Sequence, residues 1–266
     1  MKFARLIPVF VILFLIITGC DPTKRANEDP ADTKGKSASF LYDMKKIVRT
    51  AENCESGECT EVVINYPEFA LEAPRADKLN QLVNEEIQAS IKSNLFEKTT
   101  VTSTPQLIQA FLQGYKQFKN EFPESITPWF IKIDVSVSYT SEEFMTLSFN
   151  NSSYTGGAHP NYVLFYLNVS KKGKVQDRLG QFFYDSKKLK AIAEKHFREQ
   201  FNLSAEDNLA DKGFLFQKNQ FELSDNFGFN YEGVVFHYNP YEIAPYAQGA
   251  IVISIPFSEL DGNFKY

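Results

Sequence analysis

The sequence is poor in the residues that build metal centres and nucleophilic active sites. Its 266 residues include three cysteines, three histidines and one tryptophan. His159, His196 and His237 are far apart in the chain, and no HExxH or related spacing predicts a metal site. GxSxG, Walker A and dinucleotide-binding patterns are also missing. The residues alone therefore predict no metal, no cofactor and no catalytic group, and they make an enzyme the less favoured interpretation.

The sequence also lacks an apolar run long enough for an ordinary transmembrane helix, which needs about 20 residues. A shorter apolar stretch, residues 6–17, follows Lys2 and Arg5 and ends just before Gly19-Cys20. This order of positive charge, apolar run and small residue before cysteine is typical of a lipoprotein signal peptide. We expect residues 1–19 to be removed and Cys20 to carry the lipid anchor. An uncleaved membrane anchor is the alternative.

Positive charge is in the minority, with 28 basic against 33 acidic residues and a net charge of −5. This balance argues against binding to nucleic acid and against electrostatic attachment to anionic lipid. We therefore expect the protein to reach the membrane through acyl chains on Cys20, palmitate among them. The expected location is the cell envelope outside the cytoplasm, at the inner or the outer membrane.

Two cysteines remain once Cys20 is lipidated, and they are close together in Cys54-Glu55-Ser56-Gly57-Glu58-Cys59. An oxidising compartment and an even number of thiols predict a Cys54–Cys59 disulfide. A zinc site would need further ligands nearby, so it is the weaker interpretation.

The chain after the signal divides by composition. Residues 20–38 are polar and contain two prolines without any apolar period, as in a flexible tether. Helices segregated from a run of strands then predict an α+β fold, with helices packed on a mainly antiparallel sheet. We expect two subdomains, an N-terminal one over residues 39–148 and a C-terminal one over residues 149–266.

The expected elements follow from apolar spacing. A 3.6-residue period predicts three helices. The first covers residues 77–96, and the second begins at an N-cap, Thr104, with Pro105 in its first turn. The third covers residues 186–201 and is capped by Asp185. Strand patterns cover residues 61–66 (stopped by Pro67), 130–139, 145–149, 162–169 (an inner strand), 221–223, 233–238 and 250–255.

Two loops between strands have the composition of shaped surface loops. The first is Gly156-Gly157-Ala158-His159-Pro160-Asn161, in which His159 and Asn161 are presented at a site or His159 bonds the backbone of a structural loop. The second runs from Asn239 to Gly249, and its Tyr241 and Tyr246 offer flat amphipathic rings to a sugar or protein, or cover the core. His159 and His237 flank these loops and are able to meet, whereas His196 has the spacing of a core residue.

Four motifs resemble a family of bacterial envelope domains of unknown function. They are GGAHPN at 156–161, LGQFFYD at 179–185, YNPYEIAPYAQG at 238–249 and AIVISIPFSEL at 250–260. This domain type forms the extracellular part of a lysozyme-sensing anti-sigma factor and precedes the catalytic domain of a peptidoglycan deacetylase. The resemblance implies a C-terminal fold like a subdomain of the heat-shock-cognate ATPase, without ATPase activity because a phosphate loop is missing.

These features favour a lipid-anchored binding module of the cell envelope without catalysis. Its expected ligand is peptidoglycan, another glycan or a lysozyme-type protein, and its candidate binding residues are Gly156, Gly157, His159, Asn161, Asn239, Tyr241 and Tyr246. The alternative is a glycan-modifying or hydrolytic enzyme that uses His159 with a carboxylate. A scaffold in envelope assembly is a third hypothesis.

Overall fold

The computed structural model describes residues 42–51, 59–70, 74–125, 127–260 and 262–266. They all belong to one unit, Ser37–Tyr266. The expected signal peptide, Cys20, the tether and Cys54 lie outside the described residues, so these expectations stay predictions. None of the helices in the described part combines the length and the apolar character needed to span a bilayer.

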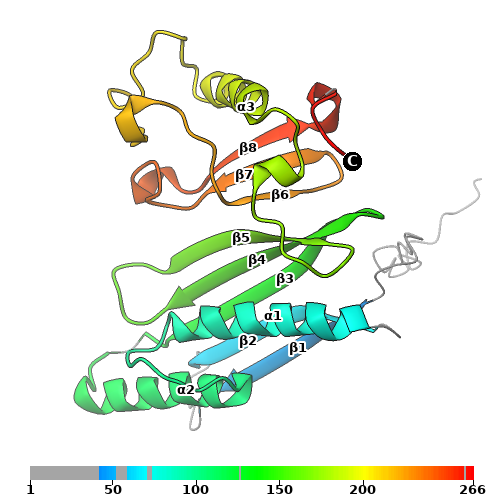
Figure 1. Ribbon diagram of the computed structural model, residues 1–266. Helices are drawn as coiled ribbons and strands as arrows, with labels where there is room; N and C mark the ends of the chain where they lie inside the picture. The colour runs from blue at the N-terminus through cyan, green and yellow to red at the C-terminus, as the bar shows by residue number, and fades with distance from the viewer. Residues whose placement is uncertain (1–41, 52–58, 71–73, 126, 261) are drawn as a thin grey trace, which may run out of the picture. The chain divides into compact units, whose positions relative to one another are not determined.

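The first sheet has five strands in the order β1-β2-β3-β4-β5 (Figure 1). The strands are β1 (Tyr42–Thr50), β2 (Glu61–Phe69), β3 (Phe130–Thr140), β4 (Phe144–Tyr154) and β5 (Asn161–Ser170). Neighbouring strands are antiparallel except β2 and β3, which are parallel. A parallel pair needs a crossover connection, and here the crossover is helical.

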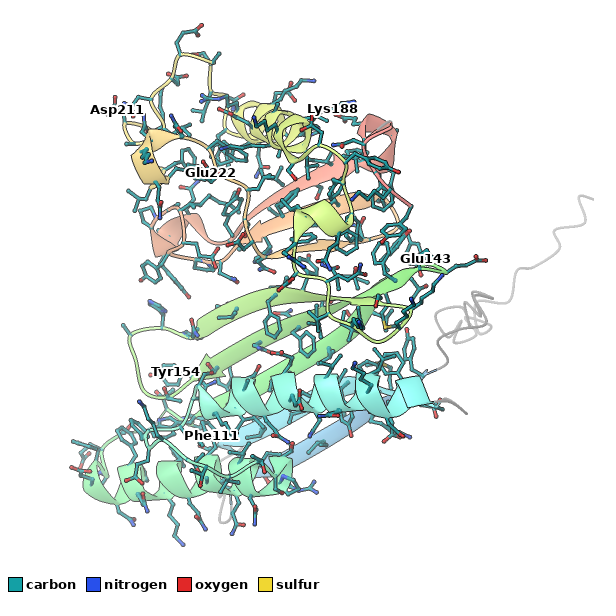
Figure 2. All side chains as sticks on the ribbon, in the orientation of Figure 1. Phe111, Glu143, Tyr154, Lys188, Asp211 and Glu222 are labelled. Carbon is teal, nitrogen blue, oxygen red and sulfur yellow. The ribbon has the colours of Figure 1, made fainter. Side chains whose placement is uncertain are left out.

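The crossover consists of α1 (Pro74–Lys92) and α2 (Thr104–Glu121), which pack on the first sheet. The apolar stripes that predicted both helices are buried against it, with Phe111 of α2 labelled in Figure 2. The buried residues of the two helices include Leu79, Val83, Ile87, Ile91, Leu107, Ile108 and Phe111.

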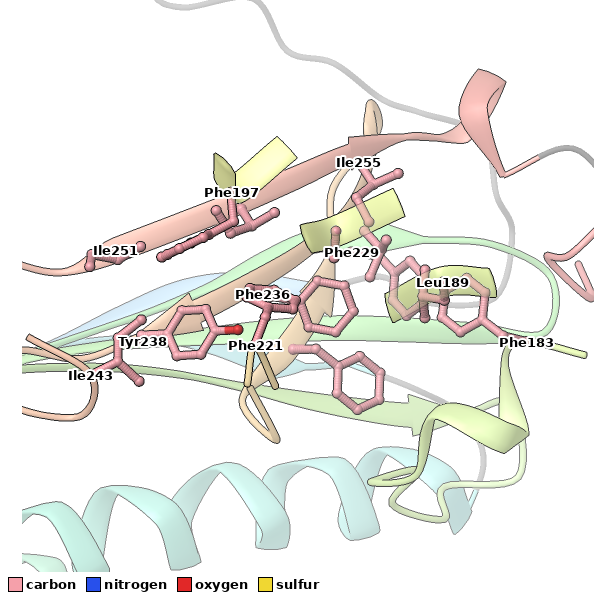
Figure 3. Packing of buried hydrophobic residues seen from close by; sticks show 14 of the residues in the cluster. Phe183, Leu189, Phe197, Phe221, Phe229, Phe236, Tyr238, Ile243, Ile251 and Ile255 are labelled. Atoms are coloured by element: carbon pink, nitrogen blue, oxygen red, sulfur yellow. The ribbon is translucent and has the colours of Figure 1, made fainter. Parts of the chain in front are cut away.

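The second sheet has three antiparallel strands, β6 (Phe227–Phe229), β7 (Gly233–Tyr238) and β8 (Ile251–Pro256). The helix α3 (Ser186–Gln200) packs on β8, and phenylalanines fill the core between them (Figure 3). Asp185 caps α3 as predicted, because its carboxylate accepts the N–H groups of Lys187 and Lys188. Four short 3₁₀ helices, η1 (Leu179–Gln181), η2 (Gln217–Asn219), η3 (Tyr246–Gln248) and η4 (Phe257–Glu259), complete this region.

The strand β4 serves both cores. Met145, Leu147 and Phe149 belong to the first core, whereas Phe144 belongs to the second. The α+β class with a mainly antiparallel sheet is thus confirmed. The expected boundary between residues 148 and 149 falls inside β4, and the division into two subdomains there stays a prediction.

Some predicted element ends are wrong. The N-cap of α2 is Ser103 rather than Thr104, because the Thr104 hydroxyl donates to Asn84 Oδ1 of α1 at 2.8 Å instead. Pro67 does not end β2, which continues to Phe69. The ladder to β3 stops at Asn65, so Pro67 has only β1 as a neighbour and its missing N–H is tolerated.

Two predictions about strands are also wrong: one segment is not a strand, and one strand has a different position in the sheet. Residues 221–223 are a loop, in which Phe221 is buried by side-chain packing without sheet pairing. β5 is an edge strand rather than an inner one. Its apolar run has a different cause, because contacts with β6 bury the side of β5 that a simple edge strand exposes to water. Gly228 of β6 permits this close approach, since an added Cβ would lie 2.4 Å from the Tyr166 ring.

Candidate functional site

The two loops that carry the sequence motifs meet in space. The imidazole of His159 stacks on the Tyr246 ring with centroids 3.8 Å apart and an interplanar angle of 20°. Tyr241 completes the group, with its ring centroid 6.4 Å from His159 and 5.4 Å from Tyr246. We call these three side chains the aromatic cluster. The two loops therefore form one surface, while their role in binding stays a prediction.

Hydrogen bonds fix the orientation of the cluster. Tyr246 Oη donates to the Pro160 carbonyl at 3.0 Å, and His159 Nδ1 lies 2.9 Å from the same oxygen. A carbonyl only accepts, so Nδ1 carries a proton. Tyr241 Oη lies 3.4 Å from Nε2, a long contact. Both ring nitrogens of His159 are therefore occupied without a carboxylate.

Tyr241 is held in a costly backbone conformation. Its φ is +73°, in the left-handed region that non-glycine residues rarely adopt, and 64% of its surface is exposed. Such a conformation costs roughly 1–3 kcal/mol and persists where the surroundings impose it, often at functional sites. Here it places a large ring in water instead of in the core.

A groove of about 480 Å³ adjoins the cluster. Its walls are the first residues of β5 and the loop from Asn239 to Ala250, with Tyr246 shared between groove and cluster. The lining residues are Asn150, Tyr162, Val163, Leu164, His237, Asn239, Pro240, Tyr246, Ala247, Gln248, Gly249 and Ala250. The groove is mostly apolar with a few polar groups, as small-ligand sites usually are.

Two asparagine side chains close the free edge of β5 beside the groove. Asn239 accepts the Leu164 N–H at 2.8 Å and donates to the Leu164 carbonyl at 3.1 Å. Asn226 accepts the Tyr166 N–H at 3.0 Å and donates to the same Leu164 carbonyl at 2.6 Å. These side-chain amides make the hydrogen bonds that the backbone of a further strand would make at this edge of the five-stranded sheet. Asn239 therefore has a structural role, and sequence reasoning missed Asn226 because nothing local marks it.

His237 lines the groove and is buried. Burial lowers the pKa of its imidazole, and the nearby Glu242 carboxylate and Asn239 amide oppose this in part. The neutral ring is thus favoured. Among the described residues, no hydrogen bond, ion pair or ring contact joins His237 to His159, so the structure does not support the expectation that they meet.

The other candidate residues have different surroundings. Asn161 begins β5, opposite Ser153, and is exposed. Gly156 is not part of the groove lining and lies beside Trp129, where an added Cβ would stand 3.4 Å from Nε1. His196, expected in the core, is partly exposed and pairs with Glu259 at 2.8 Å, away from the groove lining. In the part of the chain that the structure describes, no group of three or more His, Cys, Asp or Glu is arranged to hold a metal ion.

Two family models match the chain. Residues 182–258 match a protein of unknown function, DUF3298, and residues 53–162 match Deacetylase PdaC. The family that the motifs suggested is confirmed. Together, the DUF3298 and PdaC matches indicate a cell-envelope protein of unknown function.

Solved DUF3298 structures have the same fold. A member from Bacteroides fragilis NCTC 9343 is 20% identical, covers 86% of this chain and 94% of its own, and has a TM-score of 0.63. A DUF3298 protein from Pseudomonas aeruginosa PAO1 is 18% identical, covers 85% and 94%, and has a TM-score of 0.57. At these identities the likeness concerns the fold alone. No curated protein matches the chain.

The aromatic cluster is assembled from both matched regions. His159 comes from the PdaC-like region, whereas Tyr241 and Tyr246 come from the DUF3298 region. Each region alone contains only part of the cluster, so the site depends on the way in which the DUF3298 region packs on the first sheet.

Proposed function

We propose that this DUF3298 protein is a lipid-anchored, non-catalytic binding module of the cell envelope that holds a glycan, with peptidoglycan as the first candidate, at the aromatic cluster and its groove. The observation that carries the proposal is the exposed Tyr241 ring, held at a positive φ beside the stacked His159–Tyr246 pair. Flat amphipathic rings of this kind present apolar faces together with hydroxyl groups. They suit the apolar face and hydroxyl rim of a sugar ring.

The chemistry of His159 supports binding over turnover. A general acid or base needs access to the reacting proton and usually a group that tunes its pKa. His159 is instead bound through Nδ1 to a backbone carbonyl and contacted at Nε2 by a phenol. The His–carboxylate pair that the structure does contain, His196–Glu259, is not part of the groove lining.

Anchoring through Cys20 complements weak binding. A tether and acyl chains would hold the domain at a surface, where the effective concentration of glycan is high. Modest affinity of the aromatic cluster would then suffice for function.

A capture assay tests the proposal. The mature chain is incubated with purified peptidoglycan sacculi and, in a separate arm, with immobilised lysozyme. We expect capture by sacculi, loss of capture in a Tyr241→Ala/Tyr246→Ala double variant, and normal capture in Tyr184→Ala, which removes another exposed ring. Capture by lysozyme alone would replace the glycan with a protein partner. Steady release of products from sacculi, abolished by His159→Ala, would replace binding by catalysis.

A further inference from the structure

A second pocket, of about 680 Å³, lies at the ends of the two helices of the first sheet. It is formed by residues 94–99 after α1, by one side of α2, by Trp129 and by Thr155 and Gly156. It shares no lining residue with the groove beside the aromatic cluster. We call it the Trp129 pocket, and its size is in the range of small-ligand sites.

Trp129 gives this pocket an unused hydrogen-bond donor. The side chain is 1% exposed, and its Nε1 has no hydrogen-bond partner among the described residues. The backbone of Trp129 is fixed, because its N–H donates to Thr60 Oγ1 and its carbonyl accepts from Glu61. The indole is therefore held in place with its N–H unpaired, and a buried donor of this kind is destabilising unless an acceptor arrives.

The surroundings of Nε1 favour a ligand over a water molecule as that acceptor. The indole packs between Phe96 and Phe118, with ring centroids 5.1 Å and 4.9 Å away. Bound water needs two to four polar partners, and aromatic walls supply few. Gly156 lies next to Nε1, where an added Cβ would stand 3.4 Å from the nitrogen. Nε1 itself is buried, so binding would include a small shift of the chain at Gly156, which has no side chain to obstruct it, to admit the acceptor atom.

The rim of the pocket combines apolar faces with amides. Phe96 and Phe122 are 71% and 51% exposed, which is unusual for phenylalanine. Gln113 and Gln117 on the exposed side of α2 also line the pocket and offer both donors and acceptors. The charged lining residues are Glu97, Lys98 and Glu121. Their mixed signs favour a neutral ligand over an anion.

We propose that the Trp129 pocket binds an N-acetylated sugar. The acetamido carbonyl accepts a hydrogen bond from Trp129 Nε1 past Gly156, the methyl group lies against the aromatic wall, and the sugar face lies on the exposed phenylalanines. The hydroxyl groups face the glutamine side chains. This proposal shares with the proposed function only the glycan class of its ligand, and it assigns a different surface.

Trp129 is the one tryptophan of the chain, so it reports directly on the pocket. The mature protein is titrated with N,N′-diacetylchitobiose, and with cellobiose as the matched disaccharide that lacks acetamido groups. We expect a saturable change in tryptophan fluorescence and a shift of the indole N–H resonance with the acetylated sugar, and at least about tenfold weaker binding of cellobiose. Equal binding of both sugars, or no saturable change with the acetylated one, overturns the proposal.

Variants locate the site. Gly114→Leu places a side chain in the pocket without backbone strain, because an added Cβ would stand 3.9 Å from Trp129 and meet nothing closer. We expect at least about a tenfold loss of affinity for the acetylated sugar. Gln106→Leu, on an exposed face of the same helix outside the pocket, should keep it. If Gly114→Leu lowers the melting temperature, Gly114→Ala gives the same test with a smaller loss.

The result separates this site from the aromatic cluster. A Tyr241→Ala/Tyr246→Ala variant should bind the acetylated disaccharide normally while its sacculus capture falls. Unchanged affinity in the Gly114 variants overturns the Trp129 pocket, whereas sacculus capture that the two tyrosine changes leave intact in a Gly114→Leu background overturns the proposed function.

Discussion

The His159 ring lies 3.8 Å from the Tyr246 ring, centroid to centroid. The Tyr246 hydroxyl also donates to the carbonyl of the next residue, Pro160, which is 86 positions away in the sequence. This contact orders the exposed cluster before any ligand arrives. We expect Tyr241→Ala and Tyr246→Ala each to weaken glycan capture by about 1–3 kcal/mol, because truncating a central aromatic anchor typically has this cost.

His159→Ala should weaken capture less than either tyrosine variant, since it removes a supporting ring and no proton transfer depends on it. Sacculus binding isotherms measure the three effects, and thermal unfolding shows whether each variant is folded. A greater loss for His159→Ala than for Tyr241→Ala would make the histidine the principal contact.

Local patterns in the sequence predicted much of the fold. The apolar spacing of α1 and α2, the Asp185 cap and the alternation in β3 are properties of short segments, and the structure confirms them. The Thr104 cap failed because Asn84, 20 residues earlier, takes its hydroxyl. Similarly, the apolar run of β5 suggests an inner strand, although β5 is an edge strand that is partly covered by β6, far along the chain.

The candidate site was predicted only in part, because some of its residues are marked by local sequence and others only by contacts with distant segments. Gly, Pro, Tyr and His mark the two loops as unusual, and family motifs suggested that they form one site. Asn226 lies in an ordinary loop sequence, and only its position opposite Tyr166 makes it important. The unpaired Trp129 donor depends on Gly156 and Phe118 and has no local signal at all.

Lipid attachment is tested by Cys20→Ala. This change removes the thiol that receives the lipid, so the protein should remain unprocessed or be released without uptake of labelled fatty acid. Metabolic labelling followed by membrane fractionation measures both results. Normal labelling of Cys20→Ala would contradict the predicted anchor.

The predicted Cys54–Cys59 disulfide closes a short loop before β2. In the chain-entropy model such a loop contributes about 2 kcal/mol of stability, less any strain. We expect Cys54→Ser to lower the free energy of unfolding by this amount or less, measured by urea denaturation of the oxidised protein. Mass spectrometry of the untreated protein that finds both thiols free would contradict the disulfide.

His237 should make stability depend on pH. Burial lowers its pKa in the folded protein below the unfolded value of about 6.5, so the unfolded chain binds more protons as the pH falls. Its contribution to stability is therefore complete above about pH 6.5 and declines as the pH falls towards the lower folded pKa. Urea midpoints between pH 7.5 and pH 5 should fall for the native protein and fall less for His237→Gln. His196→Gln, a change in a partly exposed histidine, should keep the decline that His237 causes.

The asparagines at the free edge of β5 should stabilise the fold and prevent this edge from pairing with other chains. Asn226→Ala leaves the Tyr166 N–H without its acceptor, and Asn239→Ala does the same to the Leu164 N–H. Each change should cost about 1–3 kcal/mol, with the lower end expected for Asn239, where the open groove admits water. The double variant should lose more than the sum, because each single variant leaves the Leu164 carbonyl one amide donor and only the double variant removes both. Its bare edge should also pair with other chains, which light scattering at increasing protein concentration detects.

Asn120→Ala, on the exposed side of α2, is the matched control and should change neither stability nor association. Unchanged stability in both single variants would show that water replaces the amides at this edge.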